Sequence, residues 1–86
     1  MKLSDKFILH KSGKDYTMVC VDADLFSGII RVNKTTAEIV ELLKEETTEQ
    51  AIIDAMNAKY NGAEQEVEED VAMVIQRLRK LGALVE

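Results

Sequence analysis

Cys20 and His10 are the side chains of this sequence that could act together as a nucleophile and its base. Such a pair needs the base within hydrogen-bond reach and a third group that orients it. Both residues fall in predicted neighbouring strands, and nothing in the sequence supplies the third group. We therefore interpret Cys20 as a small, half-buried apolar residue and His10 as a surface residue, and we predict that the chain is not an enzyme.

Metal and cofactor sites are equally poorly supported. One Cys and one His exclude a disulfide framework and a Cys- or His-rich metal cluster within this chain. The acidic run at residues 64–70 lacks the alternating oxygen ligands and the Gly of a calcium loop. It is most simply the solvated start of a helix whose last turns carry Arg77, Arg79 and Lys80, an order of charges that the helix dipole favours. We predict no metal and no cofactor.

The stretch at residues 28–43 changes its hydrophobic period, and the rest of the chain is arranged around this change. Residues 29–32 are rich in β-branched side chains, which suit a strand, whereas the apolar side chains of residues 37–43 recur at helical spacing. The stretch is therefore predicted to be a strand that runs directly into a helix.

The start of this helix has two candidate caps. Asn33 lies at the junction, where a short polar side chain can accept a hydrogen bond from a free N–H of the first turn. Thr35 with Glu38 offers a capping box in nearly the same place. Either cap predicts that the helix begins at this junction.

Two short β-prone runs, residues 7–10 and 16–21, precede this stretch. They are separated by a polar segment that contains Gly13, so the pattern predicts a hairpin to which residues 29–32 return as a third strand. Alternate side chains of a strand face opposite sides of the sheet. The sequence leaves open which side of the second strand meets the helices.

The segment between the second and third strands, residues 22–28, is predicted to be a loop whose Leu25 and Phe26 cover an edge of the core. An Ile-rich strand with a free edge is also a template for the addition of a further strand. From the residues alone, the loop and an incoming peptide are both candidates to cover the edge of the third strand.

A second helix is predicted to follow the first. Thr48 can cap it, and Thr47 with Gln50 is an alternative capping pair. The dipeptide Asn61-Gly62 supplies the residue type that a left-handed helix end requires. The predicted apolar stripe of this helix consists of Ile52, Ala55, Met56 and Tyr60.

A third helix is predicted to start near Glu64 and to stop at Gly82, and residues 83–85 either add a short terminal strand or simply dock. The buried face of this helix is predicted to consist of Val67, Val71, Val74, Ile75, Leu78 and Leu81.

The charge distribution argues against nucleic acid as a partner. The net charge is −5: residues 1–45 hold seven Lys/Arg and seven Asp/Glu, a balance of 0, whereas residues 46–86 hold four and nine, a balance of −5. Nucleic-acid affinity comes largely from cations placed against the phosphates. The acidic half of the chain lacks the cations that such a surface requires.

The length of 86 residues predicts a single domain, residues 1–86, with little room for an active site built on loops. Residues 1–20 lack the pattern of a signal peptide, and no apolar run is long enough to span a bilayer. The protein is therefore predicted to be cytoplasmic, with no membrane partner.

Three strands followed by three helices predict an α+β fold, a small winged-helix-like domain. Such a fold makes a DNA-binding regulator the first rival function. A helix-turn-helix protein would direct the N-terminal turns of its recognition helix at bases and phosphates. In this chain those turns carry five carboxylates within residues 64–70, which would repel the duplex.

The order and spacing of these features resemble the PqqD family, named for coenzyme PQQ synthesis protein D. The shared motifs are an Asn-capped first helix, a Thr-capped second helix, and an Asp-Val third helix that ends in Leu-x-x-Leu-Gly. One departure is Lys34, where the family usually has Glu, and it leaves the cap intact. The matching segments span essentially the whole chain: residues 30–43, 48–53, Tyr60, 69–71, Leu78 and 81–84.

The resemblance implies a peptide chaperone, also called a RiPP recognition element. Such a domain binds the leader of a ribosomally made precursor peptide and presents it to a modifying enzyme, often a radical SAM protein. The leader adds as a strand beside the third strand and buries side chains in the groove toward the third helix. By this likeness Ile29, Ile30, Arg31 and Val32 are expected to supply the backbone hydrogen bonds.

The side-chain pocket is predicted on one flank of the third helix. At about 100° per residue, Asp70 and Arg77 lie together on one shoulder of the apolar stripe, with Met73 beside them, whereas Ile75 falls on the opposite shoulder. Val74 and Met73 would supply the apolar anchor site, and Asp70 and Arg77 its polar rim. The competing interpretation is that Asp70 and Arg77 are solvated charges and Met73 is an isolated exposed residue.

The sequence therefore predicts a leader-peptide binding protein with no catalytic activity of its own. Its predicted partners are a precursor leader peptide and a radical SAM or other peptide-modifying enzyme. The alternatives are an acidic winged-helix-like transcription regulator and a catalytic fragment that needs a partner to complete its active site.

Overall fold

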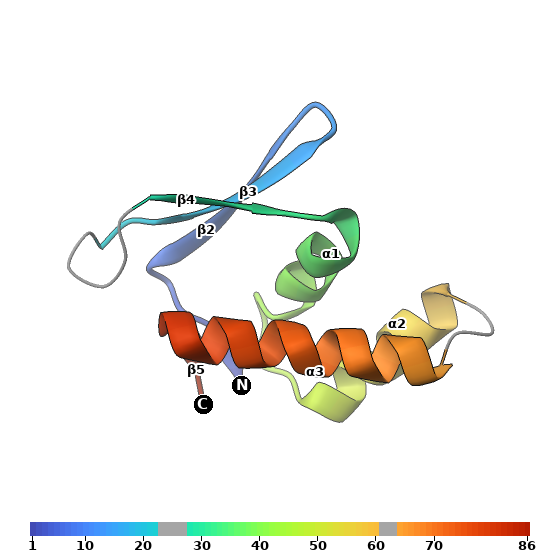
Figure 1. Cartoon of the computed structure of the whole chain (residues 1–86). Helices are drawn as coiled ribbons and strands as arrows, with labels where there is room; N and C mark the ends of the chain where they lie inside the picture. Colours follow the sequence, from blue (N-terminus) through green and yellow to red (C-terminus); the bar gives the residue numbers. More distant parts are fainter. Residues whose placement is uncertain (23–27, 61–63) are drawn as a thin grey trace.

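The structure is a computed structural model and describes residues 1–22, 28–60 and 64–86. A three-stranded antiparallel sheet is followed by three helices, as the fold-class prediction required, and a small two-stranded sheet joins the two ends of the chain (Figure 1). The elements in chain order are β1 (Lys2–Leu3), β2 (Phe7–Ser12), β3 (Asp15–Cys20), β4 (Ile29–Val32), α1 (Lys34–Leu42), α2 (Glu49–Lys59), α3 (Glu64–Leu81) and β5 (Leu84–Val85).

The predicted hairpin forms with a shorter turn than the polar segment suggested. Strands β2 and β3 pair from Phe7 opposite Cys20 to Ser12 opposite Asp15, so Gly13 and Lys14 alone make the loop. Gly13 has a φ of 60°, the left-handed conformation that a two-residue hairpin turn reserves for Gly at its first position. The polar residues on either side of the turn therefore extend the ladder.

The register of the sheet decides which face meets the helices. Met18 lies opposite Ile30 on β4, and Phe7 lies opposite Cys20; Met18 and Phe7 are buried in the core. The outer face instead carries Ile8 and Ile29, which are 52% and 68% exposed. The inner face is therefore the one that includes alternate residues 16, 18 and 20 of β3.

Asn33 is the cap of α1, as predicted. Its side-chain oxygen accepts a hydrogen bond from the Thr36 backbone N–H at 2.8 Å. The alternative capping box with Thr35 does not form, because the helix already begins at Lys34 and Thr35 lies inside its first turn. The Glu38 carboxylate instead accepts a hydrogen bond from the Tyr60 hydroxyl at 2.7 Å.

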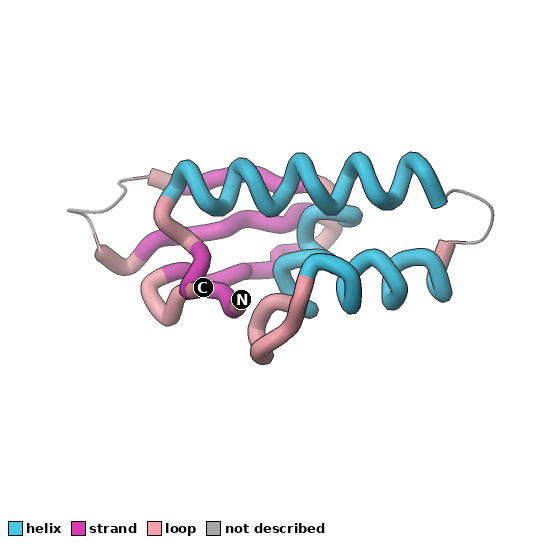
Figure 2. Tube along the Cα trace, turned by 90° about the horizontal axis from the view of Figure 1, so that it is seen from below, coloured by secondary structure: helices cyan, strands magenta, loops and turns pink. Residues whose placement is uncertain are grey.

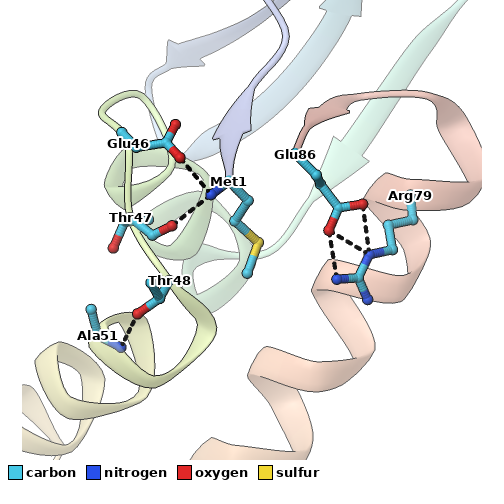
Figure 3. Close-up of polar contacts among 7 residues, drawn as sticks. All are labelled: Met1, Glu46, Thr47, Thr48, Ala51, Arg79 and Glu86. Atoms are coloured by element: carbon cyan, nitrogen blue, oxygen red, sulfur yellow. Dashed lines mark hydrogen bonds and ion pairs between the residues drawn. The ribbon is translucent and has the colours of Figure 1, made fainter.

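Thr48 caps α2, as predicted, by accepting a hydrogen bond from the Ala51 N–H at 3.1 Å (Figure 3). The apolar stripe differs in one place: Ala55 is exposed and Ile53 is buried in its stead. Helix α2 packs against both α1 and α3, so its buried face is wider than one stripe and includes Ile53. The predicted Asn61-Gly62 helix end lies outside the described residues, as do Leu25 and Phe26 of the predicted loop.

Helix α3 is the longest element and lies along the β4 side of the sheet, as the view from the helices shows (Figure 2). Its buried residues include Val71, Val74 and Leu78 as predicted. Val67 and Ile75 are also buried as predicted, whereas Leu81 is only partly buried. The shoulder opposite Ile75, with Asp70, is the less buried one.

The two ends of the chain close the bottom of the domain. Of the two predicted alternatives for residues 83–85, the short terminal strand forms, as β5. It pairs with β1, which the sequence pattern did not predict because a two-residue strand has no periodicity to detect. The N-terminal amine donates to the Thr47 carbonyl at 2.7 Å and pairs with Glu46, while Arg79 forms a two-pronged ion pair with Glu86 (Figure 3). These contacts hold the segment before α2 and the end of α3 in place.

Candidate functional site

Strand β4 is an edge strand of the three-stranded sheet. The sheet order is β2-β3-β4, and β4 pairs only with β3 in the part of the chain that the structure describes. An edge strand presents a row of unpaired N–H and C=O groups along its free side. This side of β4 can accept a further strand.

An apolar hollow lies between β4 and α3. Its free volume is about 20 Å³, close to the space that one water molecule occupies. It is therefore a narrow cleft that a large side chain can enter only if the rim side chains move. The lining residues come from β3, β4, the start of α1 and the second half of α3: Met18, Ile30, Val32, Thr36, Val74, Arg77, Leu78 and Leu81.

The predicted strand residues divide between the two faces of the sheet. Ile30 and Val32 point toward α3 and line the hollow, whereas Ile29 and Arg31 face away from it. This division follows from the alternation of side chains along a strand. All four residues lie on the edge strand, and two of them contribute side chains to the hollow.

The predicted α3 residues are also divided. Val74 is buried in the floor of the hollow, and the exposed Arg77 lies at its rim. Met73, at 57% exposed, does not line it. Asp70 lies one turn toward the N-terminus of α3 and lines a different hollow. The structure thus brings Val74 and Arg77 together with β4 and leaves Asp70 and Met73 along the outer flank of the same helix.

The second hollow, between the three helices, is larger, with a free volume of about 250 Å³. Buried side chains from the core form its floor, and two acidic residues, Glu66 and Asp70, lie among the polar groups that line it. Its lining residues are Thr35, Ile39, Met56, Tyr60, Glu66, Val67, Asp70 and Val71. The sequence offered no reason to group these residues, because they belong to three separate helices.

A polar network fixes Tyr60 at the border of this second hollow. Glu38 accepts a hydrogen bond from the Tyr60 hydroxyl at 2.7 Å, and the Lys59 ammonium lies 3.2 Å from the other carboxylate oxygen. Burial raises the pKa of Glu38, but the hydrogen bond from Tyr60 and the Lys59 charge outweigh it, so the pKa lies below its usual value. The same hydrogen bond raises the pKa of Tyr60. The network ties α1 to the end of α2.

A comparison with known families identifies the chain. The family described as Coenzyme PQQ synthesis protein D (PqqD) matches residues 7–84. The chain belongs to the PqqD family. The resemblance seen in the capped helices and the end of the third helix is therefore confirmed. A comparison with curated protein sequences finds no significant match.

Solved structures share the fold of this PqqD-family chain. A structure described as TbiB1 in complex with the TbiA(beta) leader peptide has a TM-score of 0.79 and 21% sequence identity, and the match covers 98% of this chain and 94% of that one. A lasso peptide synthetase B1 complexed with the leader peptide has a TM-score of 0.76 and 15% identity, over 99% and 96% of the two chains. At these identities the likeness shows the fold.

Cys20 and His10 are too far apart to act as a catalytic pair. Cys20 pairs with Phe7 and His10 with Thr17, so three ladder steps, or about 10 Å, separate them along the sheet. They also lie on opposite faces. The Cys20 thiol donates to the Asp22 carbonyl at 3.2 Å, and His10 is exposed.

No helix in the described ranges has the length and apolar character needed to cross a membrane.

Four residues of the β4 hollow were not among the predicted site residues: Met18, Thr36, Leu78 and Leu81. Met18 comes from β3, Thr36 from the first turn of α1, and the two leucines from the last turns of α3. Leu78 and Leu81 were predicted only as part of the apolar stripe of the third helix, and the alternation in β3 indicated two equivalent faces for Met18. No signal in the sequence would have joined Met18 and Thr36 to that stripe, because this depends on how the three elements pack against one another.

Proposed function

We propose that this protein binds the leader of a ribosomally made precursor peptide as an added strand along β4 and presents it to a modifying enzyme. The observation that carries the proposal is the edge strand β4, which pairs only with β3 among the described residues, beside an apolar hollow. Family membership supports it, and so does the presence of a leader peptide in both structures with the same fold.

In this arrangement the peptide backbone supplies affinity and its side chains supply selectivity. Main-chain hydrogen bonds to Ile29–Val32 would align the peptide, and alternate side chains, about 6.6 Å apart, would point either to the hollow or to the outer face. The inward side chains meet Ile30, Val32 and Val74, which favour an apolar partner. The small volume of the empty hollow means that Arg77, whose side chain is exposed, has to move aside or fold over the bound side chain.

The outer flank of α3 would form the rim of the binding site. Arg77 borders the hollow, and Met73 and Asp70 follow it at helical spacing toward the N-terminus of α3. A peptide that continues past the end of β4 would pass this flank. Met73 then offers an apolar contact and Asp70 a carboxylate to side chains that do not enter the hollow.

The modifying chemistry would belong to the partner enzyme, for which a radical SAM protein is our first candidate. The chain itself would carry no catalytic activity, and the complex would form in the cytoplasm. A binding module with one edge strand and one hollow needs no catalytic group of its own. The enzyme would act on the part of the precursor that extends beyond β4.

Strand addition can be tested with peptides selected from a displayed random library against the purified protein. Methylation of single backbone amides in a selected peptide removes one donor at a time. We expect a loss of affinity at every second amide, because alternate N–H groups of an added strand point toward β4. A loss with no alternation would contradict strand addition.

Chemical-shift mapping with the same peptide locates the site independently. We expect shifts at Ile29–Val32 together with Asp70, Met73 and Arg77 on α3. Ile75 faces the core on the opposite shoulder and serves as the control. Shifts confined to α2 or to the Ile75 side would overturn the placement, and tight, steeply salt-dependent binding to duplex DNA would favour a transcription regulator instead.

A further inference from the structure

A third hollow lies where β4 ends, beside the tip of the β2-β3 hairpin, and it is basic. Its free volume is about 510 Å³, and it is open to solvent. Four cationic side chains and one carboxylate line it, a balance of +3 by count, in a chain whose net charge is −5. The lining residues are Lys11, Gly13, Lys14, Asp15, Tyr16, Arg31, Val32, Asn33 and Lys34.

The cations of this hollow are weakly neutralised by the protein itself. Arg31 is 3.6 Å from Asp15, and both side chains are largely exposed, at 78% and 66%. Neither Lys14 nor Lys34 has an acidic group within 4.0 Å among the described residues, and Lys34 interacts with Glu38 only beyond that distance. Exposed pairs such as Arg31 with Asp15 contribute little to stability and exchange partners readily.

Lys34 stands where a cation is unfavourable for the free protein. It is the first residue of α1, and the first turn of this helix contains no acidic residue. The start of a helix carries a partial positive charge that favours anions and disfavours cations. A carboxylate brought into the basic hollow would relieve this repulsion as well as pair with the lysines.

The hollow is continuous with the edge where the peptide is proposed to bind. Arg31 and Val32 belong both to β4 and to the lining of the basic hollow. Val32 also lines the apolar hollow on the α3 side. The basic hollow takes residues from both faces of the sheet: Arg31 faces outward, whereas Tyr16 and Val32 face the helices.

We infer that the basic hollow recognises an acidic residue, Asp or Glu, of the bound peptide where the peptide passes the end of β4. This inference rests on the proposed function and specifies the ligand further: an extended segment with an apolar residue at the hollow beside α3 and an acidic residue near the end of β4. A nucleic acid is the less favoured occupant. Asp15 lies in the hollow and the second half of the chain is acidic, which suits one carboxylate better than a phosphate chain.

The test compares two double variants with equal changes of charge. Lys14→Gln/Lys34→Gln neutralises two cations of the basic hollow, and Lys2→Gln/Lys80→Gln neutralises two exposed lysines that line neither this hollow nor the one beside α3. Circular dichroism and thermal unfolding verify that both variants fold. The probes are peptides selected from a displayed random library against the wild-type protein, each made also with its Asp and Glu residues changed to Asn and Gln.

We expect the selected peptides to be enriched in Asp or Glu and to bind the Lys14→Gln/Lys34→Gln variant about three- to tenfold more weakly, with less than a twofold change for the control. On the wild type, the change of Asp and Glu to Asn and Gln in the peptide should lower the affinity by a similar factor. On the Lys14→Gln/Lys34→Gln variant the same change should lower the affinity little further, because the charges on the two partners interact with each other. The difference should shrink between about 50 and about 500 mM salt.

Equal losses for the two double variants, or library peptides without acidic enrichment, would overturn the inference. The backbone-methylation experiment tests strand addition independently. An alternating loss of affinity there would still support strand addition even if the inference about the basic hollow failed. Binding of duplex DNA or RNA that disappears in Lys14→Gln/Lys34→Gln would assign the hollow to nucleic acid and overturn the inference. A library that yields no binder would contradict both proposals.

Discussion

The sheet has two edges, and they differ in what lies beside them. Beside β4, on its α3 side, is an apolar hollow with a single charged residue, Arg77, and the basic hollow lies only where the strand ends. Beside β2 the surface is rich in charge: two open hollows there are lined by Lys2, Asp5, Lys11, Lys34, Glu38, Glu41, Lys44 and Lys59 together with apolar residues. Charged side chains along an edge discourage the pairing of another strand, whereas an apolar hollow rewards it. Under the proposed function, an available backbone edge is therefore not sufficient, and the apolar hollow favours β4 over β2 as the edge that the peptide joins.

Proline substitutions test this difference most strongly. Neighbouring residues of a strand direct their N–H groups to opposite sides, so one of Ile29→Pro and Ile30→Pro removes an outward donor from β4. We expect that variant to lose peptide binding by about 100-fold or more, from lost hydrogen bonds and imposed backbone geometry. The measurement is fluorescence anisotropy with a library-selected peptide.

The matched pair on the other edge is Ile8→Pro and Leu9→Pro in β2. The β2 variant that removes an outward N–H donor should leave the affinity for the peptide nearly unchanged. Thermal unfolding separates the variants that lose a bond within the sheet from those that lose an outward donor. Equal loss of binding at both edges would mean that the peptide does not distinguish them.

Truncation of the apolar lining should have the next largest effect. Ile30→Ala removes part of the hollow beside α3, and we expect the affinity to fall about tenfold, or ~1.4 kcal/mol, as for a buried anchor contact. The control is Ile8→Ala, an exposed residue on the outer face of the sheet. Calorimetric titration distinguishes the two. If Ile8→Ala weakened binding as much as Ile30→Ala, the outer face would be part of the site.

Removal of the rim charge should have a smaller and kinetically distinct effect. Arg77→Ala is expected to change affinity about two- to fivefold, mainly through the association rate, because exposed charges at a rim steer encounter more than they hold the complex. Stopped-flow measurements at two salt concentrations resolve this. Lys80→Ala, on a neighbouring exposed position of α3, should have little effect.

A change of pH should affect the β2 side of the molecule and leave peptide binding intact. The pKa of Glu38 is lowered in the folded protein, so its contribution to the free energy of unfolding is present above the unfolded pKa and is lost as the pH falls through the folded one. The stability difference between the wild type and Glu38→Gln should therefore shrink between about pH 6 and about pH 3.

Chemical denaturation at several pH values measures that difference, and anisotropy at neutral pH gives the affinity. Glu38 lies beside the β2 edge and pairs with Tyr60 and Lys59, away from the hollow at β4. We therefore expect Glu38→Gln to bind peptide like the wild type. A weaker affinity at neutral pH would show that the two sides are coupled.

The sequence predicted the local structure correctly where residues close together in the chain determine it. The strand at residues 29–32 and the caps Asn33 and Thr48 were predicted correctly, since β-branched side chains and short polar groups act on the backbone within one turn. The order of these features was also sufficient to recognise the PqqD family. The third helix was predicted to start near Glu64 and to stop at Gly82, and the structure has it over Glu64–Leu81.

The assembly of the site was decided by tertiary structure. Alternation in β3 allows two faces, and only the register with Phe7 and Ile30 selects the one with Met18. Helical spacing grouped Asp70, Met73 and Arg77, but the way α3 packs against the sheet leaves only Arg77 of the three at the β4 hollow.

The lining of the basic hollow could not be predicted from the sequence either. Lys14 and Lys34 are twenty positions apart in the sequence, and each taken alone is an ordinary surface lysine. They line one hollow because the hairpin turn lies beside the junction of β4 and α1. The chemistry of each residue and its nearest neighbours follows from the sequence, whereas the meeting of distant side chains depends on strand register and helix packing, which long-range contacts determine.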